Sequence, residues 1–413
     1  MKLLTFLGVG KYEKTVYVWN QQEQLTRFST AASCAFLKPT DLMVFLTEEA
    51  QESHFAELQT EIDPAIKIQA IPVPQGRNTQ ELWQIFDQVS RAVEPGEEVA
   101  FDITNGLRSF PLIGLLVAAF LQNGLDVKLN AVLYGAFDVR DKTVEPNRSQ
   151  MFDLSPMLEL LQWSAAADRF NRTGDARFLA SLISEERNRM GKQVGGNQEL
   201  RERVCAMGNY AGALTSVSQS LRLIRPYQTM EETAKLPSYL QKAIPALNEN
   251  NAMLPFSLLL ERVNQTFVPL GLEDPWDEAN NALSLEKQRR IIHWYVKREQ
   301  WVQAVTLSRE WMVSWFMNET GNDNLLKFKD RDDTTKRIND AFSAVRGKKN
   351  LAASDFFPGI PHAVDGLKIW YKLVSIRNDI DHAGMNDQPG SPETLIKVIK
   401  DVDLLIEGLP IKD

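Results

Sequence analysis

The feature that most constrains the fold is a change of pattern near residue 153. Before it, short apolar runs alternate with stretches whose apolar residues recur at helical spacing. The apolar runs typical of buried strands are Lys2–Leu7, Leu42–Leu46, Ile66–Val73, Val99–Thr104 and Val127–Tyr134. This alternation predicts a mostly parallel sheet with helices on both faces, in a Rossmann-like, doubly wound arrangement.

The rest of the chain predicts a helical region. Helical periodicity recurs there between clusters of Gly, Asn and Pro. The stretches are Met157–Phe170, Ala176–Ile183, Glu199–Leu223, Leu236–Ala246, Ser284–Asn318, Thr334–Val345, Ala363–Ile376 and Pro392–Glu407. The predicted fold class is therefore α/β plus all-α, with domains at 1–155 and 156–413 and inserted or linker-like helices over about 191–275.

Composition narrows the classes of function. The net charge of -8 argues against coating nucleic acid non-specifically, which needs a broad basic surface. Two cysteines are too few for a disulfide framework or a thiolate zinc site. The longest apolar stretch, Phe110–Leu121, is too short to cross a bilayer, and no signal peptide is evident. We therefore expect a cytoplasmic protein without membrane attachment.

A glycine-containing loop follows the first predicted strand. Gly8 and Gly10 let the backbone approach a ligand, and Lys11 suits a phosphate. The loop is not a dinucleotide fingerprint, because Glu13 stands where that pattern needs glycine. The alternative is a simple glycine turn with solvated lysines.

A second polar loop lies between the fourth predicted strand and a helix. Its candidate binding residues are Thr104, Asn105, Gly106, Arg108 and Ser109. A helix N-terminus presents free N–H groups and the positive end of the dipole, and an arginine fork suits phosphate oxygens. In the alternative interpretation, Ser109 only caps the helix and Arg108 is solvated.

These residues resemble a known family. The segments Phe6–Tyr12, Asp102–Pro111 and Tyr134–Phe137 resemble the CARF (CRISPR-associated Rossmann-fold) domain, and more narrowly the Csx-type ancillary effectors of type III CRISPR systems. Trp163–Gly174 and Arg290–Trp311 resemble the helical region of the same effectors. The likeness touches most of the chain, and the stretch from about 191 to 275 departs from it.

The resemblance implies a ligand and an assembly. CARF domains of this family bind a cyclic oligoadenylate, and the matching positions here are Gly8, Gly10, Lys11, Thr104, Asn105, Gly106, Arg108 and Ser109. Many relatives carry His where Asn105 stands, which leaves open the ring size and whether the site also cleaves its ligand. We favour cyclic tetra-adenylate over cyclic hexa-adenylate. A two-fold symmetric ring implies a homodimer or a higher even-numbered oligomer.

A candidate catalytic motif lies late in the chain. The run from Arg377 to His382 matches the Arg-x4–6-His signature of HEPN ribonucleases, and Asn378 follows the arginine as is common in that family. It ends a strongly amphipathic helix, and Gly384 is placed to terminate that helix. The alternative is structural: Arg377 pairs with Asp379 or Asp381, and His382 caps the helix.

The residue types suit RNA cleavage without a metal or another cofactor. His382 is a candidate general base or acid, because an imidazole titrates near neutral pH. Arg377 is placed to stabilise charge on phosphoryl oxygens, and Asn378 to orient the phosphate. We expect cleavage of single-stranded RNA with 2′,3′-cyclic phosphate products and no stable DNA binding. Two alternatives remain: a non-catalytic sensor, and a ring nuclease that destroys the cyclic oligoadenylate.

Overall fold

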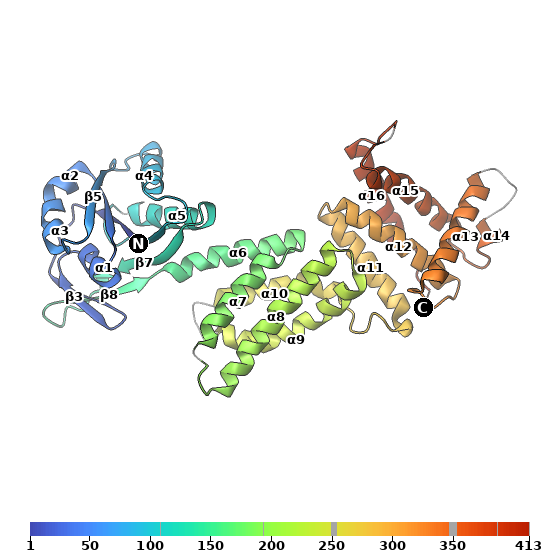
Figure 1. The fold of residues 1–413 in the computed structure, drawn as a ribbon, viewed down its shortest axis with the longest axis horizontal. Helices are drawn as coiled ribbons and strands as arrows, with labels where there is room; N and C mark the ends of the chain where they lie inside the picture. Colours follow the sequence, from blue (N-terminus) through green and yellow to red (C-terminus); the bar gives the residue numbers. More distant parts are fainter. Residues whose placement is uncertain (108, 193, 249–253, 347–352, 386, 413) are drawn as a thin grey trace. The chain divides into compact units, whose positions relative to one another are not determined.

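The computed structural model describes residues 1–413 apart from 108, 193, 249–253, 347–352, 386 and 413. The chain divides into two compact units, Met1–Gln162 and Trp163–Asp413, at a point inside helix α6 (Ser155–Thr173). The described part of the first unit is α/β, and that of the second is built from helices (Figure 1). The predicted fold class is confirmed.

One eight-stranded sheet forms the centre of the first unit, in the order β3-β2-β8-β7-β6-β1-β4-β5. Its strands are β1 (Lys2–Leu7), β2 (Thr15–Trp19), β3 (Gln22–Thr26), β4 (Asp41–Leu46), β5 (Lys67–Pro72), β6 (Glu98–Asp102), β7 (Lys128–Gly135) and β8 (Arg148–Asp153). The strands β5, β4, β1, β6 and β7 run parallel, so their carboxyl ends meet at one edge. Strand β8 is antiparallel to β7, and the β2–β3 hairpin extends the sheet beyond it.

The five parallel strands are those that the sequence predicts, whereas β2, β3 and β8 were missed. Four of the five residues of β3 are polar, so it carries little of the apolar signal by which strands are predicted. Main-chain pairing with a neighbouring strand holds each of the three in place. The fourth predicted strand was extended too far: β6 ends at Asp102, and Thr104 lies in the following loop.

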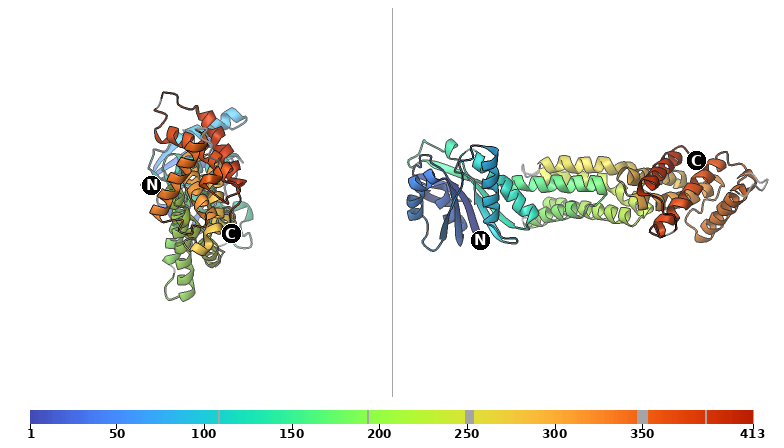
Figure 2. Two further views of the ribbon diagram at one scale, coloured as in Figure 1. Left: turned by 90° about the vertical axis from the view of Figure 1, so that its right-hand side faces the viewer. Right: turned by 90° about the horizontal axis from the view of Figure 1, so that it is seen from above.

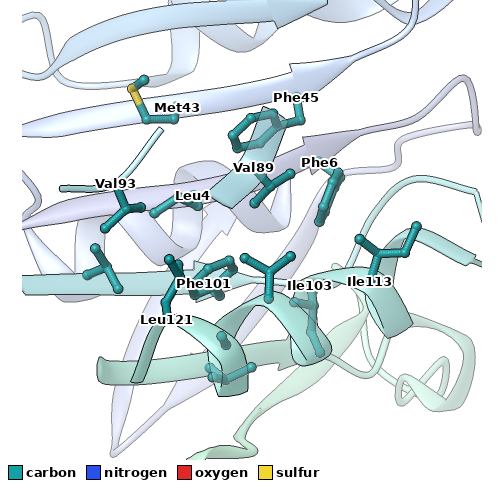
Figure 3. Packing of buried hydrophobic residues seen from close by; sticks show 14 of the residues in the cluster. Leu4, Phe6, Met43, Phe45, Val89, Val93, Phe101, Ile103, Ile113 and Leu121 are labelled. Atoms are coloured by element: carbon teal, nitrogen blue, oxygen red, sulfur yellow. The ribbon is translucent and has the colours of Figure 1, made fainter. Parts of the chain in front are cut away.

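Helices cover both faces of the sheet. Helices α4 (Thr79–Arg91) and α5 (Ser109–Gly124) pack on one face; α1 (Ser29–Leu37), α2 (Glu48–Ala50), the π-helical turn η1 (Gln51–Phe55) and α3 (Ala56–Glu61) pack on the other. Successive residues of a strand point to opposite faces. Leu4 and Phe6 of β1 therefore join the core beneath α5 (Figure 3), while Leu3 and Leu7 join the core beneath α1.

The second unit consists of packed helices. They are α7 (Arg177–Gly191), α8 (Gln198–Arg222), α9 (Pro226–Asn248), α10 (Leu254–Phe267), α11 (Asn281–Lys297), α12 (Trp301–Glu319), α13 (Phe328–Arg346), α14 (Ala353–Phe356), α15 (Ala363–Asp381) and α16 (Pro392–Glu407). Helices α7 to α10, green to yellow in Figure 2, run side by side. Helices α12, α15 and α16 pack together near the end of the chain.

One predicted helix is wrong. The sequence predicts a single helix over Ser284–Asn318, but the structure has α11 and α12 separated at Glu299, whose φ is 57°. The two helices pack against each other, so their apolar faces share one core and the apolar periodicity continues across the turn. Trp311 and Trp315 of α12 are fully buried in that core.

Candidate functional site

The carboxyl edge of the parallel strands carries a pocket of about 180 Å³. In the sheet, β4 and β5 lie on one side of β1, and β6 and β7 lie on the other, so the strand order reverses between β1 and β6. Open α/β sheets bind their ligands at such a reversal. The pocket is lined by Gly8, Gly10, Lys11, Tyr12, Tyr17, Arg27, Thr104, Asn105, Gly106, Tyr134, Gly135, Phe137 and Asp138.

The two loops singled out in the sequence meet in this pocket. Of the candidate binding residues, those that line it are Gly8, Gly10, Lys11, Thr104, Asn105 and Gly106. Ser109 is the first residue of α5 and is not part of the lining. Arg108 lies outside the described residues.

Two glycines allow the loops to approach closely. A Cβ at Gly8 would lie 3.1 Å from the amide nitrogen of Gly106. Gly106 has a φ of 106°, which favours glycine, and a Cβ there would lie 2.9 Å from Cδ2 of Phe110. The backbones after β1 and β6 can therefore form one wall of the pocket.

Hydrogen bonds join the walls. The amide of Gly8 donates to the hydroxyl of Tyr12 at 3.1 Å, and that hydroxyl lies 3.2 Å from the carbonyl oxygen of Gly8. The amide of Gly135, at the end of β7, donates to the Thr104 hydroxyl at 2.8 Å. Burial raises the pKa of Tyr12 to about 12, so its phenol keeps its proton at neutral pH.

A fully buried carboxyl group lies beside the pocket. Asp102 accepts the amide of Thr104 on Oδ1 at 3.0 Å, and its Oδ2 lies 3.2 Å from Oγ of Ser29. Ser29 accepts a hydrogen bond from Nδ2 of Asn105 at 2.8 Å. Burial raises the pKa of Asp102, while the hydrogen bonds from Thr104, Ser29 and Thr30 oppose that rise.

Two cationic side chains line the pocket and have different roles. Lys11 is exposed, with its Nζ 3.5 Å from Oε1 of Glu13, and it extends into solvent where an anionic ligand can meet it. Arg27 is half-buried; its Nη2 donates to the carbonyl oxygen of Tyr12 at 3.2 Å, and its Nη1 pairs with Glu57. Arg27 therefore supports the backbone of the first loop.

Several lining residues were not named as binding residues from the sequence. They are Tyr12, Tyr17, Arg27, Tyr134, Gly135, Phe137 and Asp138. Tyr134 ends the fifth predicted strand and Gly135 follows it, so the meeting of carboxyl ends at one edge was a usable signal for both. Tyr17 lies in β2, and no local pattern indicates that β2 pairs with β8.

The second candidate site lies at the carboxyl end of α15. Arg377 and Asn378 lie in its final turns, and His382 is the residue that follows it. The helix ends there because the backbone turns left-handed: Gly384 has a φ of 68°, and its amide donates to the carbonyl oxygen of Asp379 at 2.8 Å. The termination predicted at Gly384 is thus observed.

The side chains of Arg377, Asn378 and His382 are exposed. Nη2 of Arg377 lies 3.0 Å from Oδ2 of Asp381, and the two side chains are 44% and 43% exposed. If the motif is purely structural, Arg377 is expected to pair with Asp379 or Asp381, and this is one of those pairs. The same interpretation expects His382 to cap the helix, and His382 lies at that position. An exposed pair contributes only about 0–1 kcal/mol, so Arg377 can exchange Asp381 for another anion at little cost.

Neither a metal cluster nor a membrane span is found among the described residues. No group of three His, Cys, Asp or Glu side chains in that part of the chain is arranged to hold a metal ion. None of the helices in the described ranges has both the length and the apolarity that crossing a membrane requires.

Comparison with known proteins gives three findings. Residues 159–269 match the family described as CRISPR-associated protein MJ1674, second domain. The curated protein named CRISPR-associated protein MJ1674, from Methanocaldococcus jannaschii, is 25% identical over 179 residues, which are 42% of this chain and 26% of that protein. The chain thus spans about a quarter of the length of this relative. Helices α6 to α10 are therefore similar to a domain of CRISPR-associated proteins.

Among solved structures, Enterococcus italicus Csm6 bound to cyclic hexa-2′-fluoro-hexa-dAMP aligns with 98% of this chain and 92% of its own, at 10% identity and a TM-score of 0.44.

Proposed function

We propose that this protein is a cyclic-oligoadenylate-activated, metal-independent endoribonuclease that cuts single-stranded RNA in type III CRISPR antiviral defence. Residues 1–155 act as the CARF sensing domain and residues 156–413 contain the HEPN ribonuclease, both in the cytoplasm. The activator is a cyclic oligoadenylate, cyclic tetra-adenylate rather than cyclic hexa-adenylate. The observation that carries the proposal is the meeting of the two candidate loops in one pocket at the reversal of strand order.

The pocket chemistry suits part of a ribose–phosphate ring. Gly8 and Gly106 bring backbone close to the ligand, and Lys11 supplies positive charge. A volume of about 180 Å³ is below the roughly 300–1,000 Å³ typical of small-molecule pockets. A ring of adenosines therefore extends beyond one pocket, which fits a ligand shared by two related pockets.

An exposed apolar stripe on α5 supports a homodimer or a higher even-numbered oligomer. Leu112, Leu116 and Phe120 are 61%, 53% and 46% exposed, and their four-residue spacing puts them on one face of the helix. Ring contacts continue the stripe through Phe86 to the exposed Trp83 of α4. An exposed apolar patch of this kind favours a protein partner, and a second copy is the partner that a two-fold symmetric ring requires.

The cleavage step uses side chains at the end of α15. His382 removes the proton from a ribose 2′-hydroxyl, whose oxygen attacks the adjacent phosphorus. The bond from phosphorus to the 5′-oxygen breaks, and an imidazolium returns a proton to that leaving oxygen. Arg377 neutralises the charge on the phosphoryl oxygens, and Asn378 orients the phosphate. The products carry a 2′,3′-cyclic phosphate and a 5′-hydroxyl, and DNA is spared because it lacks the nucleophile.

The ion pair between Arg377 and Asp381 favours a second candidate: a CARF sensor whose helical unit does not cut RNA. In that case Arg377 is occupied and His382 only ends the helix. A ring nuclease is the related possibility, with Lys11, Thr104 and Ser109 as the residues to test for turnover of the ring.

One experiment separates these functions. A fluorescent single-stranded RNA is incubated with the full chain, with and without excess EDTA, and with cyclic tetra-adenylate, cyclic hexa-adenylate or no ring. We expect ring-dependent cutting, stronger with the tetra-adenylate, and 2′,3′-cyclic phosphate ends by mass spectrometry. Ring binding without RNA cutting supports the sensor, ring loss without RNA cutting supports the ring nuclease, and loss of cutting in EDTA overturns the metal-independent mechanism.

A further inference from the structure

The pocket contains a chain of buried polar groups that bears on what it recognises. Asn105 lines the pocket, and its Nδ2 donates to Ser29 of α1. Oγ of Ser29 in turn lies 3.2 Å from Oδ2 of Asp102. Ser29 and Asp102 are fully buried, so their hydrogen bonds are shielded from water. Which group donates and which accepts in each of these bonds therefore matters.

We infer that Asp102 and Ser29 are positioning residues that turn the Asn105 amide so that its Oδ1 faces the pocket, where it accepts a hydrogen bond from a donor on the ring. The donors that a cyclic oligoadenylate offers are the ribose 2′-hydroxyl and the adenine 6-amino group. This inference deepens the proposed function and rests on it.

Proton counting sets the direction of the chain. Every hydrogen bond recorded at Asp102 runs toward its carboxyl group, from the amide and hydroxyl of Thr104 and from the hydroxyls of Ser29 and Thr30, so Asp102 is the acceptor of the series. The hydroxyl of Ser29 has one proton, which it donates to Oδ2 of Asp102, so its lone pairs must accept from Asn105. Only the nitrogen end of the Asn105 side chain can donate, and the oxygen end is left for the ligand.

The reverse orientation of the Asn105 amide is disfavoured for the same reason. It would set Oδ1 of Asn105 against a Ser29 oxygen whose proton is already used, and two acceptors would face each other in a buried place. Within the described part of the chain, no group donates a hydrogen bond to Oδ1 of Asn105. The pocket therefore presents an acceptor at this point.

The test is a set of binding titrations on the full chain by calorimetry. The ligands are cyclic tetra-adenylate, the same ring without 2′-hydroxyls, and a ring of purine ribosides without 6-amino groups. The variants are S29A and, as a matched control, S33A, which removes a buried hydroxyl of the same helix that has no hydrogen-bond partner.

For the natural sequence, we expect the ring that lacks the recognised donor to bind about tenfold more weakly than cyclic tetra-adenylate, as for the loss of one hydrogen bond. The analogue that weakens identifies the donor. The difference should fall below about threefold in S29A and persist in S33A. If circular dichroism shows that S29A does not fold, D102N replaces it. An amide at position 102 can donate a hydrogen bond to Ser29 and so reverse the direction of both hydrogen bonds.

Several outcomes overturn the inference. It is wrong if both analogues bind as tightly as cyclic tetra-adenylate while that ring itself binds, or if S29A or D102N discriminates as the natural sequence does. Failure of the natural sequence to bind any ring overturns the proposed sensing function, and the inference with it.

Discussion

The two candidate sites of this protein are built in opposite ways. The pocket in the first unit is made of backbone and buried groups: close-packed glycines, a Thr104–Gly135 hydrogen bond and a buried carboxyl group. The end of α15 in the second unit carries the exposed side chains of Arg377, Asn378 and His382, and the ion pair between Arg377 and Asp381 is itself solvent-exposed. The first site is thus shaped before any ligand arrives, whereas the second can change its partners freely.

This difference fits a division between sensing and cutting. A preorganised pocket loses little freedom when it binds, which favours selectivity for one ligand. The electrostatic interactions of exposed side chains become strong only when another surface excludes water from them. In the proposed dimer, that surface is the same helix end of a second copy. The predictions below run from the largest expected effect to the smallest.

The largest effect should come from removing the imidazole at the exposed site. We expect H382A to lower ring-activated RNA cleavage by about a thousandfold, within the range for loss of a general acid–base group. The measurement is the initial rate on fluorescent single-stranded RNA.

The control is H362A at the other end of α15. His362 is also exposed, with Nδ1 3.6 Å from Oδ2 of Asp365, and the variant should keep its rate within about twofold. Unchanged cleavage in H382A would mean that the helix end is not the cutting site.

The second largest effect is expected from a change in the backbone of the preformed pocket. G106A should lower the free energy of unfolding of the first unit by about 3 kcal/mol, because its φ of 106° strains an L-residue and its Cβ meets Phe110 and Phe6. Urea unfolding followed by circular dichroism measures it. G10A is the control, since a Cβ at Gly10 meets nothing within 4 Å and should change stability by less than about 0.5 kcal/mol. Equal stability of the two variants would contradict a pocket held by close backbone contact.

A pH effect on stability should also come in part from the buried pocket. Burial raises the pKa of Tyr12 to about 12, so between about pH 10 and 12 the unfolded chain loses the phenolic proton while the folded chain keeps it. Stability should therefore fall as pH rises through this window, by up to about 2.5 kcal/mol from Tyr12.

The comparison is between Y12F and Y371F in urea unfolding from pH 9 to 12. Y12F should flatten the decline in part, since burial also raises the pKa of Tyr17, Tyr210 and Tyr295. Y371F removes a tyrosine hydroxyl from an exposed position on α15 and should leave the decline unchanged. Identical slopes in the two variants would refute the role of burial.

The smallest effect should come from the exposed ion pair. D381A should change the free energy of unfolding by less than about 0.5 kcal/mol, because solvent screens the pair with Arg377. RNA cleavage should stay within about threefold. D365A is the control, since Asp365 pairs with Lys368 on the same helix. A rate loss above about tenfold in D381A alone would place Asp381 in the catalytic machinery.

Local patterns predicted the centre of the fold well. The five parallel strands and most helices carry their own apolar periodicity, so their existence could be inferred residue by residue. The same reasoning placed Gly8 and Asn105 at one edge, because carboxyl ends of parallel strands meet. It failed for β3, whose polar residues give no such signal, and at Glu299, where the apolar pattern runs through a turn.

The sequence alone determined the α/β-then-helical order, the glycine-bearing loop after β1, and the helix end that carries Arg377 and His382. These are local properties of residue type and spacing. That Ser29 lies between Asp102 and Asn105, which are 73 and 76 residues away along the chain, is visible only in the folded molecule. A hydrogen bond across such a separation depends on where α1 packs on the sheet. That packing is set by the apolar core, to which the polar residues themselves contribute no pattern.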